Sequence, residues 1–543
     1  SNWVAAYASL SGALPLAGGT MTGNIVLGTN TVGGLQITTT ATSNIGLGTG
    51  AVDSITTGDY NVGIGDDALT ATTSGDQNVA IGFEALKANT TAIHNTAIGY
   101  RAMYTHVTGN DNTAVGQEAL YTNNGGTGNT AVGRRALQLN TNALSNTAVG
   151  EYALSANTTG DYNVALGANA LDANTTASNN TAVGKDSLGA NTTASDNTAI
   201  GYRSLKTNTT GAGATAVGRD SLYSNTTGTF NTAVGKYALW SNTTANNNTA
   251  VGYDSLSANT TGGDNNAFGK QAMADNTTGS NNTAIGHNAL TANTTADSNT
   301  SIGYASMLAN TTGASNVAVG GQALTSNTTG QKNTALGLNS LILNQTGSEN
   351  VAVGVFALQT LTSGSTNVAV GDEALNAYVN SNNTAVGSGC MKATTTGADN
   401  VAMGRECLKN QTSGANNVAI GFRAGYSTNL TTTGSQNTFL GSYCHGSSAT
   451  ASYEVVIGHD VTGVGANHVT IGRDNGSANR IYNNFTSNAT WTRTSDERIK
   501  KDIVTNNDCG LAFINDLRTV TYKFKAPSEI DESMKLHNSE KTS

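Results

Sequence analysis

The sequence contains only two prolines, Pro15 and Pro527, and the long stretch between them has none. Because proline removes a backbone donor and interrupts hydrogen-bonded ladders, its absence suits one continuous β array. Charged residues make up 11% of the chain and aromatic residues 6%. Both shares are low for ordinary globular domains, which argues against a row of conventional enzyme domains.

Other common features are also scarce. Four cysteines do not make a disulfide framework, and Cys390 and Cys407 stand at one repeat position where a small buried residue is expected. The net charge of -9 gives no basic surface for nucleic acid. No run of eighteen apolar residues occurs, so the sequence predicts no membrane insertion. It also predicts no metal site and no cofactor.

A seventeen-residue unit fills most of the chain and reads N-T-A-V-G-x-x-A-L-x-x-N-T-T-G-x-x. Its first asparagine recurs without a change of spacing from Asn44 to Asn367, with Ala214 standing in once. Such a period is typical of stacked coils. Alternating β-branched residues bounded by Asn, Thr and Gly favour strands over helix. The sequence therefore predicts an all-β, elongated parallel β-solenoid (β-roll) whose 17-residue coils each contain two strands, N-T-A-V-G and A-L-x-x.

Alternation along the first strand separates two faces. Position four is usually Val or Ile, and position nine is Leu or Met. We expect these two columns to meet inside the coil, with Val115, Val132, Leu120 and Leu137 as examples of the core ladder. Two large apolar side chains per coil bury little surface against the entropy of ordering seventeen residues. A further apolar surface should therefore be buried.

Positions three and five of the strand are Ala and Gly almost throughout. Small residues in a row allow another backbone to approach closely. We interpret Ala114, Gly116, Ala131 and Gly133 as the axial face of a homotrimer. The alternative is that Ala and Gly relieve crowding inside a single-chain solenoid.

Two other columns invite interpretation. The asparagines of position one should stack into amide ladders, as in in-register β arrays. The 89–91 motif matches a glycosylation acceptor, but a repeated turn generates such matches, so we interpret Asn89 as a turn residue. Positions six and seven carry variable charged and aromatic residues, and we interpret them as a solvated face, with glycan binding as the alternative.

Composition and register divide the chain into four parts. We expect an N-terminal connector at 1–43, a solenoid shaft at 44–472 that becomes irregular and caps the stack from about 425, and a neck at 473–494. From residue 495 to 543 the charge density rises abruptly, which predicts a separate module that is incomplete as given.

That last module opens with S-D-E-R-I-K, residues 495–500, followed by K-D-I. This motif resembles the start of the intramolecular chaperone of phage tail fibres and tailspikes, the S74 self-cleaving peptidases. The resemblance implies a short α/β chaperone fragment that assembles three chains and then cleaves itself. It makes Ser495 the nucleophile, Lys500 the general base and Thr494–Ser495 the scissile bond. A serine–lysine pair of this kind acts once on its own chain, and no turnover enzyme is expected.

Two further resemblances agree. Residues 14–23, L-P-L-A-G-G-T-M-T-G, resemble a segment common in phage tail proteins. The N-T-A-V-G-x-x-A-L unit is similar to the head repeats of trimeric autotransporter adhesins, which implies a trimeric parallel β-roll.

These observations predict a homotrimeric phage tail fibre, a virion protein made in the host cytoplasm and displayed outside the cell. Its expected partners are two further copies of itself, other virion tail proteins, and a host surface receptor that is a glycan or a protein. A cell-surface trimeric adhesin is the alternative. A polysaccharide-degrading tailspike and an ice-binding array are remote alternatives.

Overall fold

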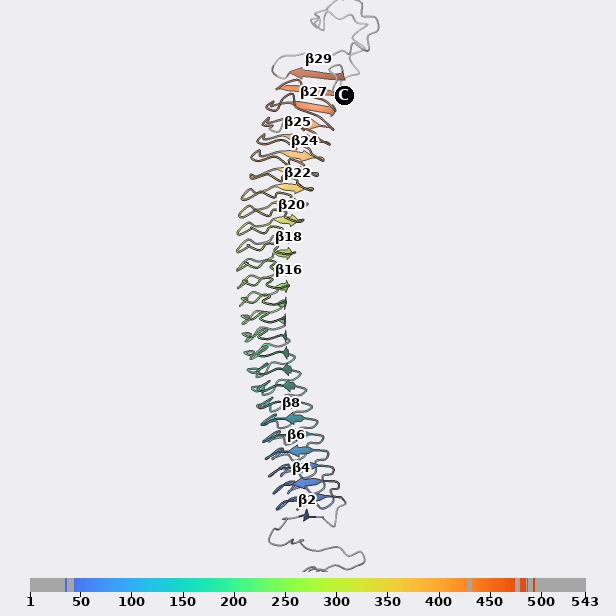
Figure 1. Ribbon diagram of the computed structural model, residues 1–543, viewed down its shortest axis with the longest axis vertical. Coiled ribbons are helices and arrows are strands. Elements are labelled where there is room, and N and C mark those ends of the chain that lie inside the picture. Colours follow the sequence, from blue (N-terminus) through green and yellow to red (C-terminus); the bar gives the residue numbers. More distant parts are fainter. Residues whose placement is uncertain are drawn as a thin grey trace, which may run out of the picture.

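The computed structural model describes residues 35–36, 43–426, 432–473, 479–484, 486 and 492–493. They form one long stack of coils in which the strands lie one above another (Figure 1). Neighbouring strands of the repeat pair in parallel and in register, as Thr113 with Thr130 and Val115 with Val132. The described ranges contain no α-helix. The predicted all-β parallel solenoid with 17-residue coils is confirmed.

The regular stack consists of strands β2 to β25, one in each coil. They are β2 (Ile45–Leu47), β3 (Val62–Ile64), β4 (Val79–Ile81), β5 (Thr96–Ile98), β6 (Thr113–Val115), β7 (Thr130–Val132), β8 (Thr147–Val149), β9 (Val164–Leu166), β10 (Thr181–Val183), β11 (Thr198–Ile200), β12 (Thr215–Val217), β13 (Thr232–Val234), β14 (Thr249–Val251), β15 (Asn266–Phe268), β16 (Thr283–Ile285), β17 (Thr300–Ile302), β18 (Val317–Val319), β19 (Thr334–Leu336), β20 (Val351–Val353), β21 (Val368–Val370), β22 (Thr384–Val386), β23 (Val401–Met403), β24 (Val418–Ile420) and β25 (Thr438–Leu440).

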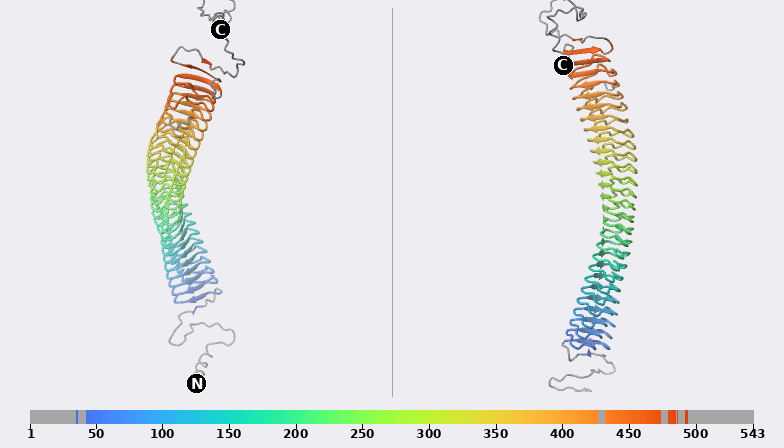
Figure 2. Two further views of the ribbon diagram at one scale, coloured as in Figure 1. Left: turned by 45° about the horizontal axis from the view of Figure 1, so that its top comes forward. Right: turned by 180° about the vertical axis from the view of Figure 1, so that it is seen from behind.

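The ends of the stack depart from this pattern. At the N-terminal end β1 (Leu35–Gln36) pairs antiparallel with β2. At the other end β26 (Val455–His459) and β27 (His468–Arg473) continue the parallel order, and β28 (Arg480–Asn484) and β29 (Thr492–Arg493) add antiparallel strands. Antiparallel pairing covers the open edge that a parallel stack would otherwise expose. Figure 2 shows that the stack between these ends bends gently along its length.

Each coil contains one strand, so the second strand predicted at A-L-x-x is wrong. In β6's coil, Glu118 and Leu120 have positive φ angles of 56° and 51°, and the segment folds into tight turns. The Leu120 N–H nevertheless donates to the Ala136 carbonyl of the next coil at 2.9 Å. Left-handed backbone costs an L-residue about 1–2 kcal/mol. The complete burial of Leu120 offsets this cost.

The two faces of the strand are the reverse of our expectation. Leu120 and Leu137 are fully buried, as predicted, but the residues they meet inside the coil are Ala114 and Ala131. The predicted core residues Val115 and Val132 instead lie on the outside of the strand and are only partly buried.

The reason is the width of the coil. At Gly63, which replaces the position-three alanine, an added Cβ would lie 2.9 Å from Val52 Cγ1 and 3.2 Å from the Ala68 carbonyl oxygen. A Cβ is already crowded at this point, so the larger side chain of a valine would not fit beside Val52. Ala114 and Ala131 therefore relieve crowding inside one chain, and their assignment to a trimer axis is wrong.

Gly116 and Gly133 serve a different purpose from the predicted axial contact. Gly116 has φ 136°, a conformation that L side chains rarely adopt, and a Cβ added to it would lie 2.6 Å from the Gly133 carbonyl oxygen. The glycine column is thus required by the close approach of successive coils within one chain.

The predicted amide ladder at position one is confirmed. Asn112 is fully buried, and its Nδ2 donates to Asn95 Oδ1 at 3.1 Å and to the Gly126 carbonyl at 2.8 Å. Its Oδ1 in turn accepts from the backbone N–H of Asn129 at 2.9 Å. Each amide therefore joins the coil below to the coil above.

A second amide ladder runs through position twelve, which the sequence led us to regard as a turn. Asn157 is fully buried, and its Nδ2 donates to Asn140 Oδ1 at 3.1 Å and to the Gly160 carbonyl at 3.0 Å. Asn89 belongs to this column and is also fully buried. Its amide is therefore out of reach of a glycosylating enzyme, which supports the structural interpretation of that motif.

We predict that Asn112→Ala destabilises its coil by about 2–3 kcal/mol, because several buried hydrogen bonds lose a partner. Asn124 in the same coil is exposed and provides the matched control. Amide hydrogen exchange, which measures local opening, should show faster exchange in residues 96–129 for Asn112→Ala only. Equal exchange in both variants would contradict the importance of the ladder.

His106 replaces asparagine in the second ladder and gives a pH prediction. It is fully buried; its Nε2 lies 2.6 Å from the Gly109 carbonyl oxygen, and its Nδ1 lies 2.9 Å from Asn123 Nδ2 and 3.1 Å from the Asn123 carbonyl oxygen. With its proton on Nε2, the ring donates to Gly109 and accepts from the Asn123 amide. This arrangement fits the neutral ring. Burial lowers the pKa of His106 below its ordinary value of 6.5.

The unfolded chain therefore binds a proton on His106 at a higher pH than the folded chain. Its contribution to stability is complete above pH 6.5 and is lost as the pH falls from 6.5 toward the folded pKa. Hydrogen exchange in this coil should accelerate between pH 7.5 and 5.5 beyond the intrinsic effect of pH. The His106→Asn variant, which restores the repeat residue, should remove this extra change; its persistence would assign it to another group.

Candidate functional surfaces

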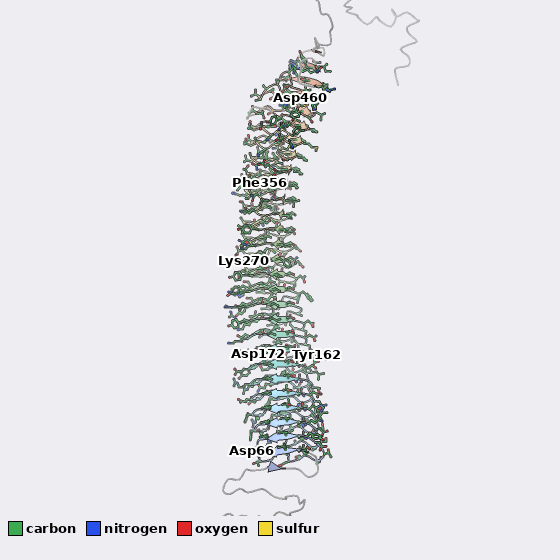
Figure 3. The ribbon with its side chains drawn as sticks, turned by 45° about the vertical axis from the view of Figure 1, so that its right-hand side comes forward. Asp66, Tyr162, Asp172, Lys270, Phe356 and Asp460 are labelled. Atoms are coloured by element: carbon green, nitrogen blue, oxygen red, sulfur yellow. The ribbon has the colours of Figure 1, made fainter. Side chains whose placement is uncertain are left out.

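The coil presents three surfaces to solvent, each made by fixed positions of the unit. The outer strand face consists of positions two and four, which flank the buried alanine. One edge, formed by positions six, seven and ten, follows the strand, and the opposite edge, formed by positions sixteen and seventeen, precedes it. Figure 3 shows Asp66, Asp172 and Lys270 along the first edge and Tyr162 on the second.

The outer strand face carries no charged residue from β2 to β25. Its side chains are threonine, valine and isoleucine in most coils, with Leu, Met or Phe in a few. Many of the apolar ones are exposed, such as Ile98 at 37%, Leu166 at 47% and Met403 at 50%. Exposed apolar side chains that adjoin one another along a surface often mark a site of contact with another protein.

The edge before the strand is acidic, and we call it the acidic edge. Its carboxylates are Asp59, Asp76, Asp111, Asp161, Asp196, Asp264, Asp297, Glu349 and Asp399. Several of them have a structural role, because their oxygens accept backbone N–H groups of the preceding coil. Asp161 Oδ1 accepts from the Leu144 N–H at 2.7 Å, and Asp297 Oδ1 accepts from the Ser280 N–H at 2.7 Å.

The edge after the strand carries most of the shaft's cations and aromatic rings, and we call it the aromatic edge. Its cations are Lys87, Arg101, Arg134, Arg135, Lys185, Arg203, Lys206, Arg219, Lys236, Lys270, Lys392, Arg405, Lys409 and Arg423. The in-register stack places equivalent side chains of successive coils next to one another. Rings consequently stack across coils, as Tyr104 and Tyr121 do at a centroid distance of 5.2 Å.

Ion pairs between coils accompany this stacking. Glu84 accepts from Lys87 Nζ and from Arg101 Nε, each at 2.6 Å, and the hydrogen bond from Lys87 is the main cause that lowers the pKa of Glu84. Hydrogen bonds from Lys409 and Arg423 likewise lower the pKa of Glu406 to about 2. These carboxylates are charged partners of neighbouring cations. The sequence predicted a solvated face here but did not reveal the contacts between coils, because Arg101 and Glu84, like Arg423 and Glu406, lie seventeen residues apart.

The proposed self-cleavage site is not part of this geometry. Thr494, Ser495 and Lys500 lie outside the described residues. Cys390, Cys407 and Cys444 are buried free thiols, consistent with the interpretation of Cys390 and Cys407 as small buried residues. Within the described ranges, no group of three or more potential metal ligands comes together. The same ranges contain no helix with the length and hydropathy of a membrane span.

Comparison with known protein families bears on the C-terminal segment. Residues 495–538 match the S74 peptidase family, described as the chaperone of endosialidase. No curated protein matches the chain. The resemblance inferred from residues 495–500 is therefore confirmed. A long β-solenoid followed by such a segment fits a tail-fibre or tailspike-like protein.

Proposed function

We propose that this chain forms the shaft of a homotrimeric phage tail fibre that attaches the virion to a host cell surface. The observation that carries the proposal is an assembly-chaperone segment at 495–538 placed after a long, unbranched β-solenoid. The fibre belongs to the virion, and its other partners are tail proteins and a receptor on the host. In this proposal the shaft acts by extending from the virion and displaying its surfaces.

The outer strand face supplies the contact between the three chains. It is uncharged over its whole length and exposes apolar side chains that a partner would remove from water. A parallel arrangement about a threefold axis brings the same face of every copy to the centre, which closed symmetry requires. This interface takes the place of the Ala/Gly face, whose residues are enclosed within one chain.

The C-terminal segment then assembles the trimer and is released. In this scheme the Ser495 hydroxyl attacks the carbonyl carbon of Thr494 while Lys500 accepts its proton. The acyl bond to the nitrogen of Ser495 breaks, and that nitrogen takes a proton as the leaving amine. Water hydrolyses the resulting ester and regenerates the serine. Lysine performs this role only when its surroundings lower its pKa.

Thiol cross-linking tests the interface. We expect Val132→Cys, on the outer strand face, to give covalent pairs of chains with a short bismaleimide under native conditions. Leu139→Cys is the matched control, because Leu139 is apolar and 45% exposed but lies away from the strand. By sedimentation, the native protein should have a mass three times that of the single chain seen on a denaturing gel. A monomeric mass, or equal cross-linking of the two variants, would contradict the proposed trimer.

Self-cleavage is tested separately by expressing the full-length gene with Ser495→Ala and with Lys500→Met. The wild type should migrate on denaturing gels as a shortened chain, whereas both variants should remain uncleaved. Ser487→Ala, a serine on the other side of the bond, serves as the control and should cleave normally. If wild type and Ser495→Ala have the same mass, the assignment of the catalytic pair is wrong.

A further inference from the structure

One long stretch of the aromatic edge carries a surplus of positive charge. Between Lys185 and Lys270, this edge carries more cations than carboxylates, although the whole chain has a net charge of -9. The cations are Lys185, Arg203, Lys206, Arg219, Lys236 and Lys270, and the carboxylates are Asp186, Asp220 and Asp254. Lys185 and Lys270 are five coils apart, which corresponds to ~24 Å along the stack. We call this stretch the basic strip.

A buried carboxylate organises two guanidinium groups in the basic strip. Asp220, with a side chain only 1% exposed, accepts from Arg203 Nε at 2.8 Å and from Arg219 Nε at 3.1 Å. Because only the Nε atoms are engaged, the terminal Nη groups of both arginines have no hydrogen-bond partner among the described residues. They remain available as donors to an anion outside the protein. The guanidinium fork matches a carboxylate in shape and charge.

Aromatic rings lie beside these donors. Arg203 lies over Tyr202 at 4.8 Å and over Tyr223 at 5.1 Å, which fixes the guanidinium between two rings. Tyr223 stacks with Trp240 at a centroid distance of 6.4 Å. Trp240 nevertheless stays 44% exposed. An indole face open to solvent beside ordered cations provides an apolar platform next to anion donors.

Lysines that are not held close to a carboxylate extend the strip on both sides of the two arginines. Within the described part of the chain, Lys185 and Lys270 form no ion pair, whereas Lys206 lies 3.8 Å from Asp186. Lys236 contacts the rings of Tyr237 and Tyr253 at 4.6 and 5.7 Å. In the coils around Arg134, by contrast, the cations are matched by Glu118 and Glu151. The surplus of cations is thus absent from the coils around Arg134.

We propose that the basic strip binds an acidic polysaccharide that lies along the fibre axis. Carboxylates on successive sugars would accept from Arg203, Arg219 and the lysines, and the apolar faces of the sugars would stack on Trp240 and the neighbouring tyrosines. The repeat of coils matches a polymer better than a single small ligand, because equivalent donors recur along the axis. The strip lies beside the outer strand face and leaves that face available for trimer formation. The inference rests on the proposed attachment function and names its receptor chemistry.

Affinity electrophoresis of the full chain tests this proposal, with polygalacturonate as the acidic probe and dextran as the neutral one. Polygalacturonate should retard the wild type, and dextran should not. The dissociation constant should rise about tenfold in Arg219→Gln, through loss of a charge-assisted hydrogen bond. It should rise by a similar factor in Trp240→Ala, through loss of an aromatic platform. Raising the salt concentration should weaken the wild-type complex.

Matched controls come from the same positions of other coils. Arg134 occupies the repeat position of Arg219, and Tyr121 occupies that of Trp240. Arg134→Gln and Tyr121→Ala should therefore bind polygalacturonate as the wild type does. The proposed binding site is wrong if the trimer does not bind polygalacturonate, if it binds dextran equally well, or if the control variants lose binding to the same extent. None of these results would contradict the proposed fibre. A monomeric mass for the same sample would instead overturn the fibre.

Discussion

The structure depends on keeping successive coils in register at the spacing of hydrogen-bonded strands. Each side chain then lies directly against its own equivalent in the next coil, as Asn112 does against Asn95 and Asn129. When a buried polar side chain has an identical side chain above and below it, the two can hydrogen-bond only if each both donates and accepts. Asparagine meets this condition and therefore fills two buried columns. An amide can donate to one neighbouring coil and accept from the other, so the pattern repeats along the whole stack. A carboxylate only accepts and an ammonium only donates, so neither could form such a column.

The same constraint explains which positions can vary. Inside the coil, Ala114 and Leu120 are both fully buried, and Gly116 must allow the carbonyl of the next coil to approach. A change at any of these positions affects three coils at once. The edges have no such requirement, since their side chains project into solvent. Charge and aromatic character therefore accumulate there, and the coils differ from one another mainly at these edges.

The sequence predicted the period, the parallel β class and the first amide ladder because these depend on spacing and residue type alone. It did not predict which face of the strand is internal. Alternation separates Ala114 from Val115 but cannot say which one points inward, and the usual preference of the larger residue for the core gave the wrong answer. The deciding quantity is the width of the coil, which depends on the turns around Leu120. Those turns use left-handed leucine, a conformation that no propensity scale would assign to it. The assignment of Ser495 and Lys500 as a catalytic pair depends on the sequence motif alone, because neither residue lies in the described part of the structure.

The regular repeat also creates a problem that an assembly module would solve. In the proposed trimer, three chains with nearly identical coils could align with one chain displaced by a whole coil, and such an alignment would keep almost every contact of the outer strand face. The energy difference between the correct and the displaced trimer is then small, because only the ends lose partners. Correct alignment must come from a part of the chain that does not repeat. A segment at 495–538 that brings three chains together at one end would fix the register before the shaft forms, and the shaft would then propagate it coil by coil. On this view the chaperone is a consequence of the repeat, since the features that make the shaft regular also prevent it from choosing its own alignment.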